Sequence, residues 1–325
     1  MTDWGREIEA VLPAEFGGVV SIGSCDQVDW EGAYGLAHRA HQVPTTRSTR
    51  FAIASGTKAF TALVIVSLLS EGALSLTSTA RPLLGEDLPL VGDDVTVEHL
   101  LAHTSGIGDF IDHETGQLPP HVPGYRLVNT EDYLVALSGL PPAFPAGTQF
   151  SYCNGGYVVL ALIAERVCGR GFHELVDERV FGPAEMVESA FFRLDALPGY
   201  AAVGYLEDGR TNVFAAPVRG NGDGGAYTTV SDVRRFWAAL VAGRIVSAGW
   251  VQQMISPQSA GPPAHRMHYG WGVWLDGSVV VLDGGDHGVS FRSAFEPSSR
   301  RLWTVASNTM DGAAPIVQRV RDLIF

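Results

Sequence analysis

The feature that most constrains the fold is a helix of about residues 57–71 that is apolar almost all round. A helix without a polar face must be buried on most sides. A chain of 325 residues is long enough to enclose it in a substantial core. The longest apolar stretch, FTALVIVSLL at 60–69, is only about half a membrane span. The sequence therefore predicts a globular protein packed around this helix.

Strand patterns lie near both ends of the chain, and helical patterns lie between them. After a first helix at 3–12, strands are predicted at 17–24 and 30–38; from about residue 205 they return, at 269–275, 278–284, 289–297 and 301–308. Short helical patterns alternate with Pro/Gly loops from about 81 to 204. The last residues predict a helix with one apolar face, made of Ile316, Val317, Val320, Leu323 and Ile324.

This order predicts an α/β fold with a helical insertion. Both ends would join one sheet domain, formed by residues 1–80 and 205–325 and flanked by helices. Residues 81–204 would form a mainly helical inserted domain.

The net charge of the chain and the composition of its N-terminal segment limit the partners and the location that we expect. A net charge of −13 argues against nucleic-acid or anionic-membrane partners, which require basic patches. The segment MTDWGREIEAVL lacks the basic start and apolar centre of a signal peptide. We therefore expect a cytoplasmic enzyme with a small-molecule substrate. Cys25, Cys153 and Cys168 have no CxxC spacing, which favours buried free thiols.

Lys58 is the only lysine in the chain and lies three residues after Ser55. On a helix, residues three apart are neighbours on one face, so the two side chains can touch. A serine hydroxyl is a poor nucleophile and needs a base. A desolvated lysine can be that base, whereas arginine practically cannot lose its proton. The helix N-terminus would also favour negative charge developing at Ser55.

Two further stretches carry groups suited to the same chemistry. Tyr152 and Asn154 lie at a loop-to-helix junction in FSYCNGG. A phenol beside a lysine can relay protons, and an amide can hold a substrate carbonyl. In LDGGDHGVSFRS, His287 and three glycines stand where a strand begins. Glycines there would let a substrate approach the edge of that strand.

The ordered motifs SGTK, YCN and DHG resemble the S-x-x-K, Y-x-N and H-x-G motifs of the serine β-lactamase and D-Ala-D-Ala carboxypeptidase-like hydrolases. The likeness is greatest to the class C β-lactamases and their relatives, the family VIII esterases and D-aminopeptidases. It runs from about residue 15 to 310 and includes VTVEHLLAHTSGI, FPAGTQFSYCN and GDGGAYTTVSDVRRF. The resemblance implies an antiparallel sheet with flanking helices and an active site between the sheet and the helical domain.

The resemblance also implies roles for particular residues. Ser55 would form an acyl-enzyme on small esters, amides or β-lactams, with Lys58 and Tyr152 as the general base. Asn154 would bind the substrate amide and steady Lys58. The oxyanion hole would use the Ser55 N–H and a strand N–H near Gly288 or Val289. No cofactor or metal is implied.

The third motif departs from the family pattern. β-Lactamases and penicillin-binding proteins usually carry K-T-G there, and this chain has no lysine left for it. His287 is the candidate replacement, although a second register places glycine at that position and makes His287 a turn residue. Arg292 is a candidate ligand for a substrate carboxylate, or else an exposed or salt-bridged residue. Without the usual cation, esters, lactones and D-amino-acid amides are favoured over β-lactams.

Three alternatives stay open from the sequence. His99 and His103 have the i, i+4 spacing of a metal site, near Asp109, Asp112 and His113, but the glutamate of HExxH is absent. The chain could be a catalytically silent binding domain on the same fold. The acyl-enzyme could also pass its acyl group to an alcohol or amine, as an acyltransferase does. The oligomeric state is not indicated.

Overall fold

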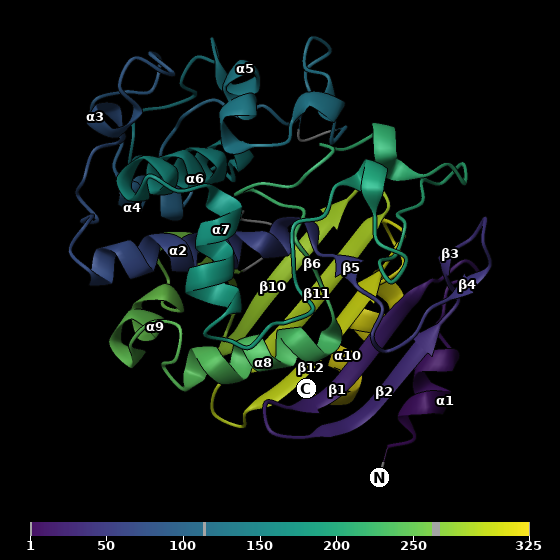
Figure 1. The fold of residues 1–325 in the computed structure, drawn as a ribbon. Coiled ribbons are helices and arrows are strands. Elements are labelled where there is room, and N and C mark those ends of the chain that lie inside the picture. The colour runs from purple at the N-terminus through teal and green to yellow at the C-terminus, as the bar shows by residue number, and fades with distance from the viewer. Residues whose placement is uncertain (1, 113–114, 262–266, 325) are drawn as a thin grey trace.

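The computed structural model describes residues 2–112, 115–261 and 267–324. Its centre is an eight-stranded antiparallel sheet with the strand order β2-β1-β12-β11-β10-β9-β8-β7. The strands are β1 (Gly18–Ser24), β2 (Val28–Tyr34), β7 (Ser259–Ala260), β8 (His268–Tyr269), β9 (Trp274–Asp276), β10 (Val279–Asp286), β11 (Val289–Glu296) and β12 (Arg301–Ser307). The first strand of the chain, β1, thus pairs directly with the last, β12, and β2 forms the edge beside β1 (Figure 1).

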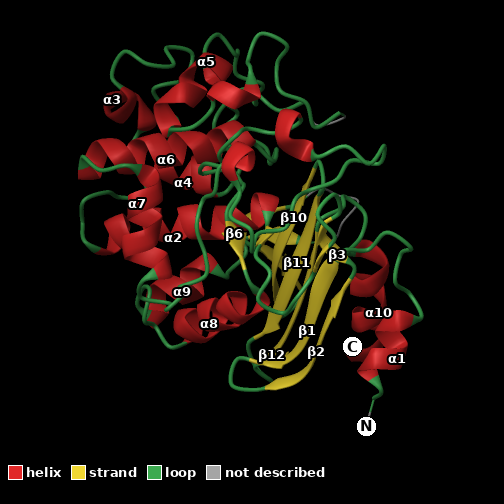
Figure 2. Cartoon of the chain, turned by 45° about the vertical axis from the view of Figure 1, so that its right-hand side comes forward, coloured by secondary structure: helices red, strands yellow, loops and turns green. Residues whose placement is uncertain are grey.

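Helices cover both faces of this sheet. On one face lie α1 (Trp4–Glu9) and α10 (Ala314–Ile324), which contact each other and share a hydrophobic cluster with Val20, Trp303 and Val305. On the other lie α8 (Val230–Val241) and α2 (Lys58–Ser70), with α9 (Ala248–Met254) beside them (Figure 2). Because both faces are covered, β1 is buried along nearly its whole length. This explains why its sequence shows no polar alternation.

The predicted buried helix is α2, in which every residue from Lys58 to Leu69 is buried. It packs against α6 (Asn154–Cys168) and α7 (Phe172–Val176) in the helical part of the molecule. Its hydrophobic cluster extends without a break from that part to the sheet, where it includes Phe291 and Ala306. The predicted division into a sheet domain and a helical inserted domain, with boundaries at 80/81 and 204/205, therefore stays a prediction.

The helical part lies at one end of the sheet (Figure 1). Besides α6 and α7 it contains α3 (Ala80–Leu84), α4 (Val97–Leu101), α5 (Leu134–Leu137) and the single turns η2 (Gly124–Arg126), η3 (Thr130–Tyr133), η4 (Asp177–Phe181) and η5 (Leu194–Ala196). The remaining short elements are β3 (Leu36–His38), β4 (Val43–Pro44), β5 (Phe51–Ala52), η1 (Ala54–Thr57), η6 (Asn212–Phe214) and β6 (Tyr227–Thr228). The predicted fold class is confirmed.

Two local predictions were wrong. The prediction of strands from about residue 205 onward overlooked helices α8 and α9. Helix α8 begins after Thr229, whose side chain accepts a hydrogen bond from the Asp232 N–H. The strand predicted at 269–275 is divided between β8 and β9 by a turn at Gly272, whose φ is 73°. A side chain at Gly272 would lie 2.5 Å from the Lys58 carbonyl oxygen, so glycine lets this turn pack on α2. No helix in the described parts of the chain has the length and apolar character needed to cross a membrane.

Candidate active site

Ser55 is held in a strained turn at the start of α2. The preceding residue, Ala54, is buried and has a φ of 42°, a region that non-glycine residues enter at a cost of about 1–3 kcal/mol. Hydrogen bonds fix the turn on both sides: the Gly56 N–H donates to the Ile53 carbonyl at 2.9 Å, and the Gly225 N–H donates to the Ala54 carbonyl at 3.3 Å. The surrounding structure thus fixes the position of the serine.

Lys58 is 1% exposed and makes three hydrogen bonds. Its Nζ lies 3.0 Å from Ser55 Oγ, 2.8 Å from Asn154 Oδ1 and 2.6 Å from the Asp223 carbonyl oxygen. The amide and carbonyl oxygens can only accept. In a neutral amine, the two N–H groups would serve these acceptors and the lone pair would face Ser55. The arrangement therefore suits transfer of the serine proton to Lys58.

Asn154 is oriented by a carboxylate. Its Nδ2 donates to Asp109 Oδ2 at 3.2 Å, which leaves Oδ1 for Lys58. Asp109 also accepts the N–H groups of Asn154 and Gly155, each at 2.9 Å, in the first turn of α6. Cys153 is buried and caps the same helix, because its Sγ accepts the Gly156 N–H at 3.3 Å. Sequence reasoning named Asp109 only beside the alternative metal site and missed its role in orienting Asn154, since nothing in its spacing links the two residues.

Tyr152 places an aromatic ring beside the lysine. Lys58 Nζ lies 4.8 Å from the ring centroid. The ring stacks on the Trp274 ring, with 5.8 Å between centroids, and its centroid lies 4.3 Å from that of the His103 ring. The His103 Nδ1 accepts a hydrogen bond from the Cys153 N–H at 3.1 Å. Among the described residues its hydroxyl has no hydrogen-bond partner, and Tyr152 lines the cavity at Ser55. The structure thus brings together the three predicted catalytic residues.

The hairpin of β10 and β11 forms another wall of the site. A Cβ on Gly284 would lie 2.0 Å from the Ile53 carbonyl oxygen and 3.0 Å from the Gly56 nitrogen, so only glycine allows β10 to approach the serine turn this closely. A two-residue turn follows at His287 and Gly288, where Gly288 has a φ of 72°. The edge of β10 is therefore fixed next to Ser55.

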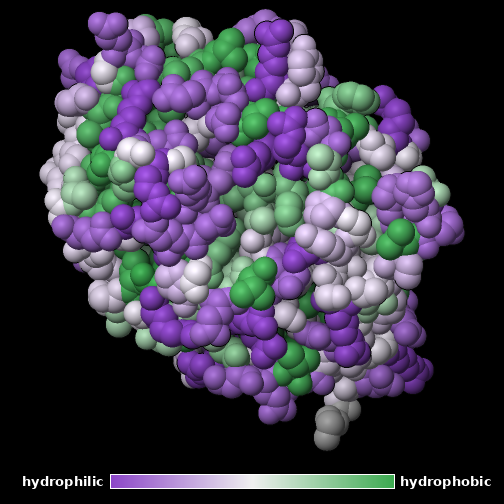
Figure 3. Space-filling model, viewed as in Figure 1, coloured by the Kyte–Doolittle hydropathy of each residue, from purple (hydrophilic) through white to green (hydrophobic). Residues whose placement is uncertain are grey.

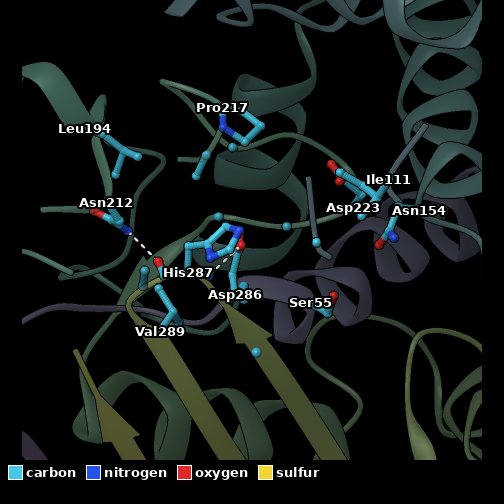
Figure 4. A pocket seen from close by; sticks show the side chains of 18 of the residues that line it. Ser55, Ile111, Asn154, Leu194, Asn212, Pro217, Asp223, Asp286, His287 and Val289 are labelled. Carbon is cyan, nitrogen blue, oxygen red and sulfur yellow. Dashed lines mark hydrogen bonds between the residues drawn. The ribbon is translucent and has the colours of Figure 1, made fainter. Parts of the chain in front are cut away.

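The predicted binding residues of this hairpin divide into two groups. His287 and Val289 line the cavity (Figure 4). The backbone of His287 makes two hydrogen bonds. Its carbonyl oxygen accepts from Asn212 Nδ2 at 2.9 Å, and the His287 N–H donates to Asp286 Oδ1 at 2.7 Å. Gly288 packs against the backbone at Tyr205: a Cβ there would lie 2.6 Å from the Tyr205 nitrogen.

Arg292 is the predicted site residue that the structure places elsewhere. Its Nε is 2.8 Å from Asp283 Oδ1, on the neighbouring strand β10. Both residues line a groove toward α10, and neither lines the cavity at Ser55. Successive side chains of β11 alternate between the faces of the sheet, and Phe291 takes the face toward Gly56. Arg292 therefore points the opposite way.

Ser55 opens into a cavity of about 350 Å³ between the helical part and the sheet. The space-filling view shows a recess near the middle of this face, with hydrophobic residues inside and hydrophilic residues around it (Figure 3). In close-up, Ser55, Asn154 and Asp223 lie on one side, and Asp286 and His287 lie between them and Asn212 (Figure 4). The cavity is large enough for a small organic substrate.

A model of the family described as Beta-lactamase matches residues 6–322. The chain belongs to the β-lactamase family. It is a serine hydrolase of this class, as the predicted motifs indicated.

Relatives and solved structures agree with this assignment. The chain is 25% identical to PbpX of Bacillus subtilis, which bears a penicillin-binding-protein name, over 92% of this chain and 72% of PbpX. It is 26% identical to esterase EstB of Burkholderia gladioli over 79% of this chain and 73% of EstB. It spans only 36% of protein flp of Staphylococcus aureus, to which it is 29% identical over 57% of this chain.

Two solved structures extend the comparison. A penicillin-binding protein from Bacillus halodurans has 34% identity and a TM-score of 0.90, with all of both chains covered. A D-stereospecific amidohydrolase from Streptomyces has a TM-score of 0.82 at 22% identity, with 100% of this chain and 99% of the other covered. The second shows likeness of fold alone.

Carboxyl groups give this β-lactamase-family site an acidic character. Asp223 and Asp286 line the cavity, as does Asp112. Burial raises the pKa of Asp223 to about 6; Lys58 lowers it, whereas Asp109 and Asp286 raise it. Burial also raises the pKa of Asp286 against the opposing effects of His287 and Lys58. The sequence offered only a weak signal for these two residues, the glycine that precedes each of them.

The residues of the alternative metal site have other roles. His99 belongs to the capping box of α4: its Nδ1 accepts the Thr96 N–H at 3.3 Å. His103 packs among Tyr152, Tyr157 and Tyr269. Within the described ranges no cluster of metal-ligating side chains is present, and His113 lies outside them. The structure offers no observation in favour of the metal alternative.

Proposed function

We propose that this protein hydrolyses small esters or amides through an acyl-enzyme at Ser55, with Lys58 and Tyr152 as the general base. The observation that carries the proposal is the 3.0 Å contact between Ser55 Oγ and Lys58 Nζ. Because two fixed oxygens occupy the other directions around Nζ, the amine is aligned on the serine.

The reaction would proceed in two stages. Lys58 takes the proton of Ser55 as Oγ bonds to the substrate carbonyl carbon. Tyr152 then passes a proton from Lys58 to the departing alkoxide or amine, which breaks the original ester or amide bond. In the second stage Tyr152 and Lys58 take a proton from water, whose oxygen attacks the acyl carbon. The acid leaves, and Ser55 regains its proton.

Backbone N–H groups would stabilise the oxyanion in both stages. The Ser55 N–H at the helix start is one donor. The second would come from the edge of β10 at Gly285, because Gly285 lines the cavity and directly follows Gly284, which packs against the serine turn. Gly288, a predicted donor, packs toward Tyr205, which makes it the weaker candidate.

The charge of the cavity favours substrates without a carboxylate. No lysine or arginine is among the described residues that line it, and Arg292 faces away. A penicillin or a D-Ala terminus presents a carboxylate, which three lining aspartates would repel. EstB, a relative named as an esterase, supports the ester preference. We therefore place esters and amides ahead of β-lactams.

Intact-mass spectrometry tests the acyl-enzyme directly. Mixing the protein with excess p-nitrophenyl butyrate and quenching in acid should leave a butyryl adduct on the wild type. Ser55→Ala should show no adduct and no p-nitrophenolate release. Ser48→Ala, on the exposed surface, is the matched control and should behave as wild type. An adduct of equal yield on Ser55→Ala would refute the proposal.

A further inference from the structure

The cavity holds more acidic groups than hydrolysis requires. Asp223 and Asp286 both border it, and neither carboxylate is paired with a lysine or arginine side chain in the described structure. In the described structure, Asp286 Oδ1 accepts a hydrogen bond from the His287 N–H at 2.7 Å. The proposed mechanism assigns no step to either carboxylate.

The geometry of β10 directs Asp286 toward the reaction centre. Side chains two residues apart on a strand project from the same face, so Asp286 shares the face of Gly284. That face meets the serine turn, because a Cβ on Gly284 would lie 3.0 Å from the Gly56 nitrogen. Two residues along a strand correspond to about 7 Å. Asp286 is thus suitably placed for a group one or two carbons from the carbonyl.

Tyr227 provides an independent indication of a ligand. Its side chain is 1% exposed and lines the cavity, and its hydroxyl has no hydrogen-bond partner in the described ranges. Asp286 is close enough that, together with burial, it raises the pKa of the Tyr227 phenol. A ligand that donates hydrogen bonds could satisfy both groups at once.

Aromatic residues complete the surroundings. Tyr133, Tyr152, Phe192 and Tyr227 all line the same cavity. Aromatic rings attract organic cations through their faces, and carboxylates pair with them. A cavity with this composition suits an alkylammonium better than a neutral or anionic group.

We propose that the cavity selects substrates with an ammonium group one or two carbons from the carbonyl that Ser55 attacks, and that Asp286 determines this specificity. The inference rests on the proposed function and adds its substrate class, an amino-acyl ester or amide with a free amino group. Asp286 and the Tyr227 hydroxyl would accept hydrogen bonds from the ammonium. Acetylation of the amine would remove its charge, and succinylation would replace it with a repelled carboxylate.

A series of p-nitroanilides of D- and L-phenylalanine tests the selection: free amine, N-acetyl and N-succinyl. We expect the wild-type kcat/KM to be about tenfold or more higher for the free amine than for the N-acetyl compound, and lowest for N-succinyl. Asp286→Asn should reduce the free-amine to N-acetyl ratio by about tenfold. Asp283→Asn is the matched control, because it makes the same change on the same strand outside this cavity, and should keep the ratio.

Binding to the wild type supplies a readout that needs neither turnover nor a folded variant. Calorimetry should give a Kd about tenfold or more lower for benzylammonium than for benzyl alcohol. Equal Kd values, a preference for the acetylated or succinylated substrate, or an unchanged ratio in folded Asp286→Asn would each overturn the inference.

The two proposals fail in different ways. If Ser55 forms no butyryl adduct, the proposed hydrolase function fails, whereas the benzylammonium preference still tests the cation site. If the adduct forms but the free-amine, N-acetyl and N-succinyl substrates have the same kcat/KM, only the inference about the substrate fails.

Discussion

Replacing Asp223 with asparagine should stabilise the protein at neutral and alkaline pH. The pKa of this carboxyl is raised from 3.8 to about 6, mainly by burial, so the folded state holds the proton more tightly than the unfolded chain does. Stability must therefore fall as pH rises between these two values. The cost of the ionised form approaches about 3 kcal/mol above pH 6, because each pKa unit corresponds to about 1.4 kcal/mol.

Asparagine has no charge to bury, so the variant avoids this cost. It also keeps the backbone carbonyl that accepts from Lys58. The gain in unfolding free energy of Asp223→Asn over wild type should be about 2 kcal/mol larger at pH 8 than at pH 4.5, where the carboxyl is mostly protonated in the folded protein. Urea unfolding at both pH values, followed by tryptophan fluorescence, measures the difference. A gain that is the same at both pH values would contradict the buried-carboxylate reasoning.

Two further substitutions test the base and its support. Lys58→Arg should fold with a Tm near that of wild type but lose about a thousandfold or more in kcat/KM for p-nitrophenyl butyrate, because arginine does not release its proton at neutral pH; turnover near wild type would disprove the base role. Asp109→Asn should lower kcat about 10- to 100-fold with little change in KM and should shift the pH profile, because Asn154 loses its orientation. Asp93→Asn, on the exposed surface, is its control and should change neither kcat nor the pH profile.

Local spacing was enough to predict the Ser55–Lys58 pair. The two residues lie at the N-terminal end of a helix with a clear apolar pattern, and one helical turn fixes how near they are. Tyr152 and Asn154 were candidates because of their side-chain chemistry at a loop-to-helix junction, and the family resemblance gave them their roles. Their contacts to Lys58 depend on the packing of α6 against α2, which no spacing within either segment determines.

The third motif shows where sequence reasoning reached its limit. In a run rich in glycine, hydrophobic alternation gives no register, so the faces taken by His287 and Arg292 could not be assigned. The structure resolves the register through two packing facts, the approach of Gly284 to Ile53 and the pairing of Arg292 with Asp283. Both involve partners that are defined only once the sheet has formed.

The acidic residues connect the stability of the protein to its choice of substrate. Burial raises the pKa of Asp223, Asp286 and Tyr227, and the Asp286 carboxylate raises the pKa of Asp223 and Tyr227 further. The cavity therefore concentrates negative charge at an energetic cost. A substrate ammonium would offset that cost on binding, whereas a carboxylate would add to it. The same charge that lowers the stability of the free protein would thus raise its discrimination between substrates. The gain in stability of Asp223→Asn should accordingly be accompanied by weaker binding of benzylammonium. If Asp223→Asn gained stability but bound benzylammonium with the wild-type Kd, the proposed link between stability and substrate choice would be wrong.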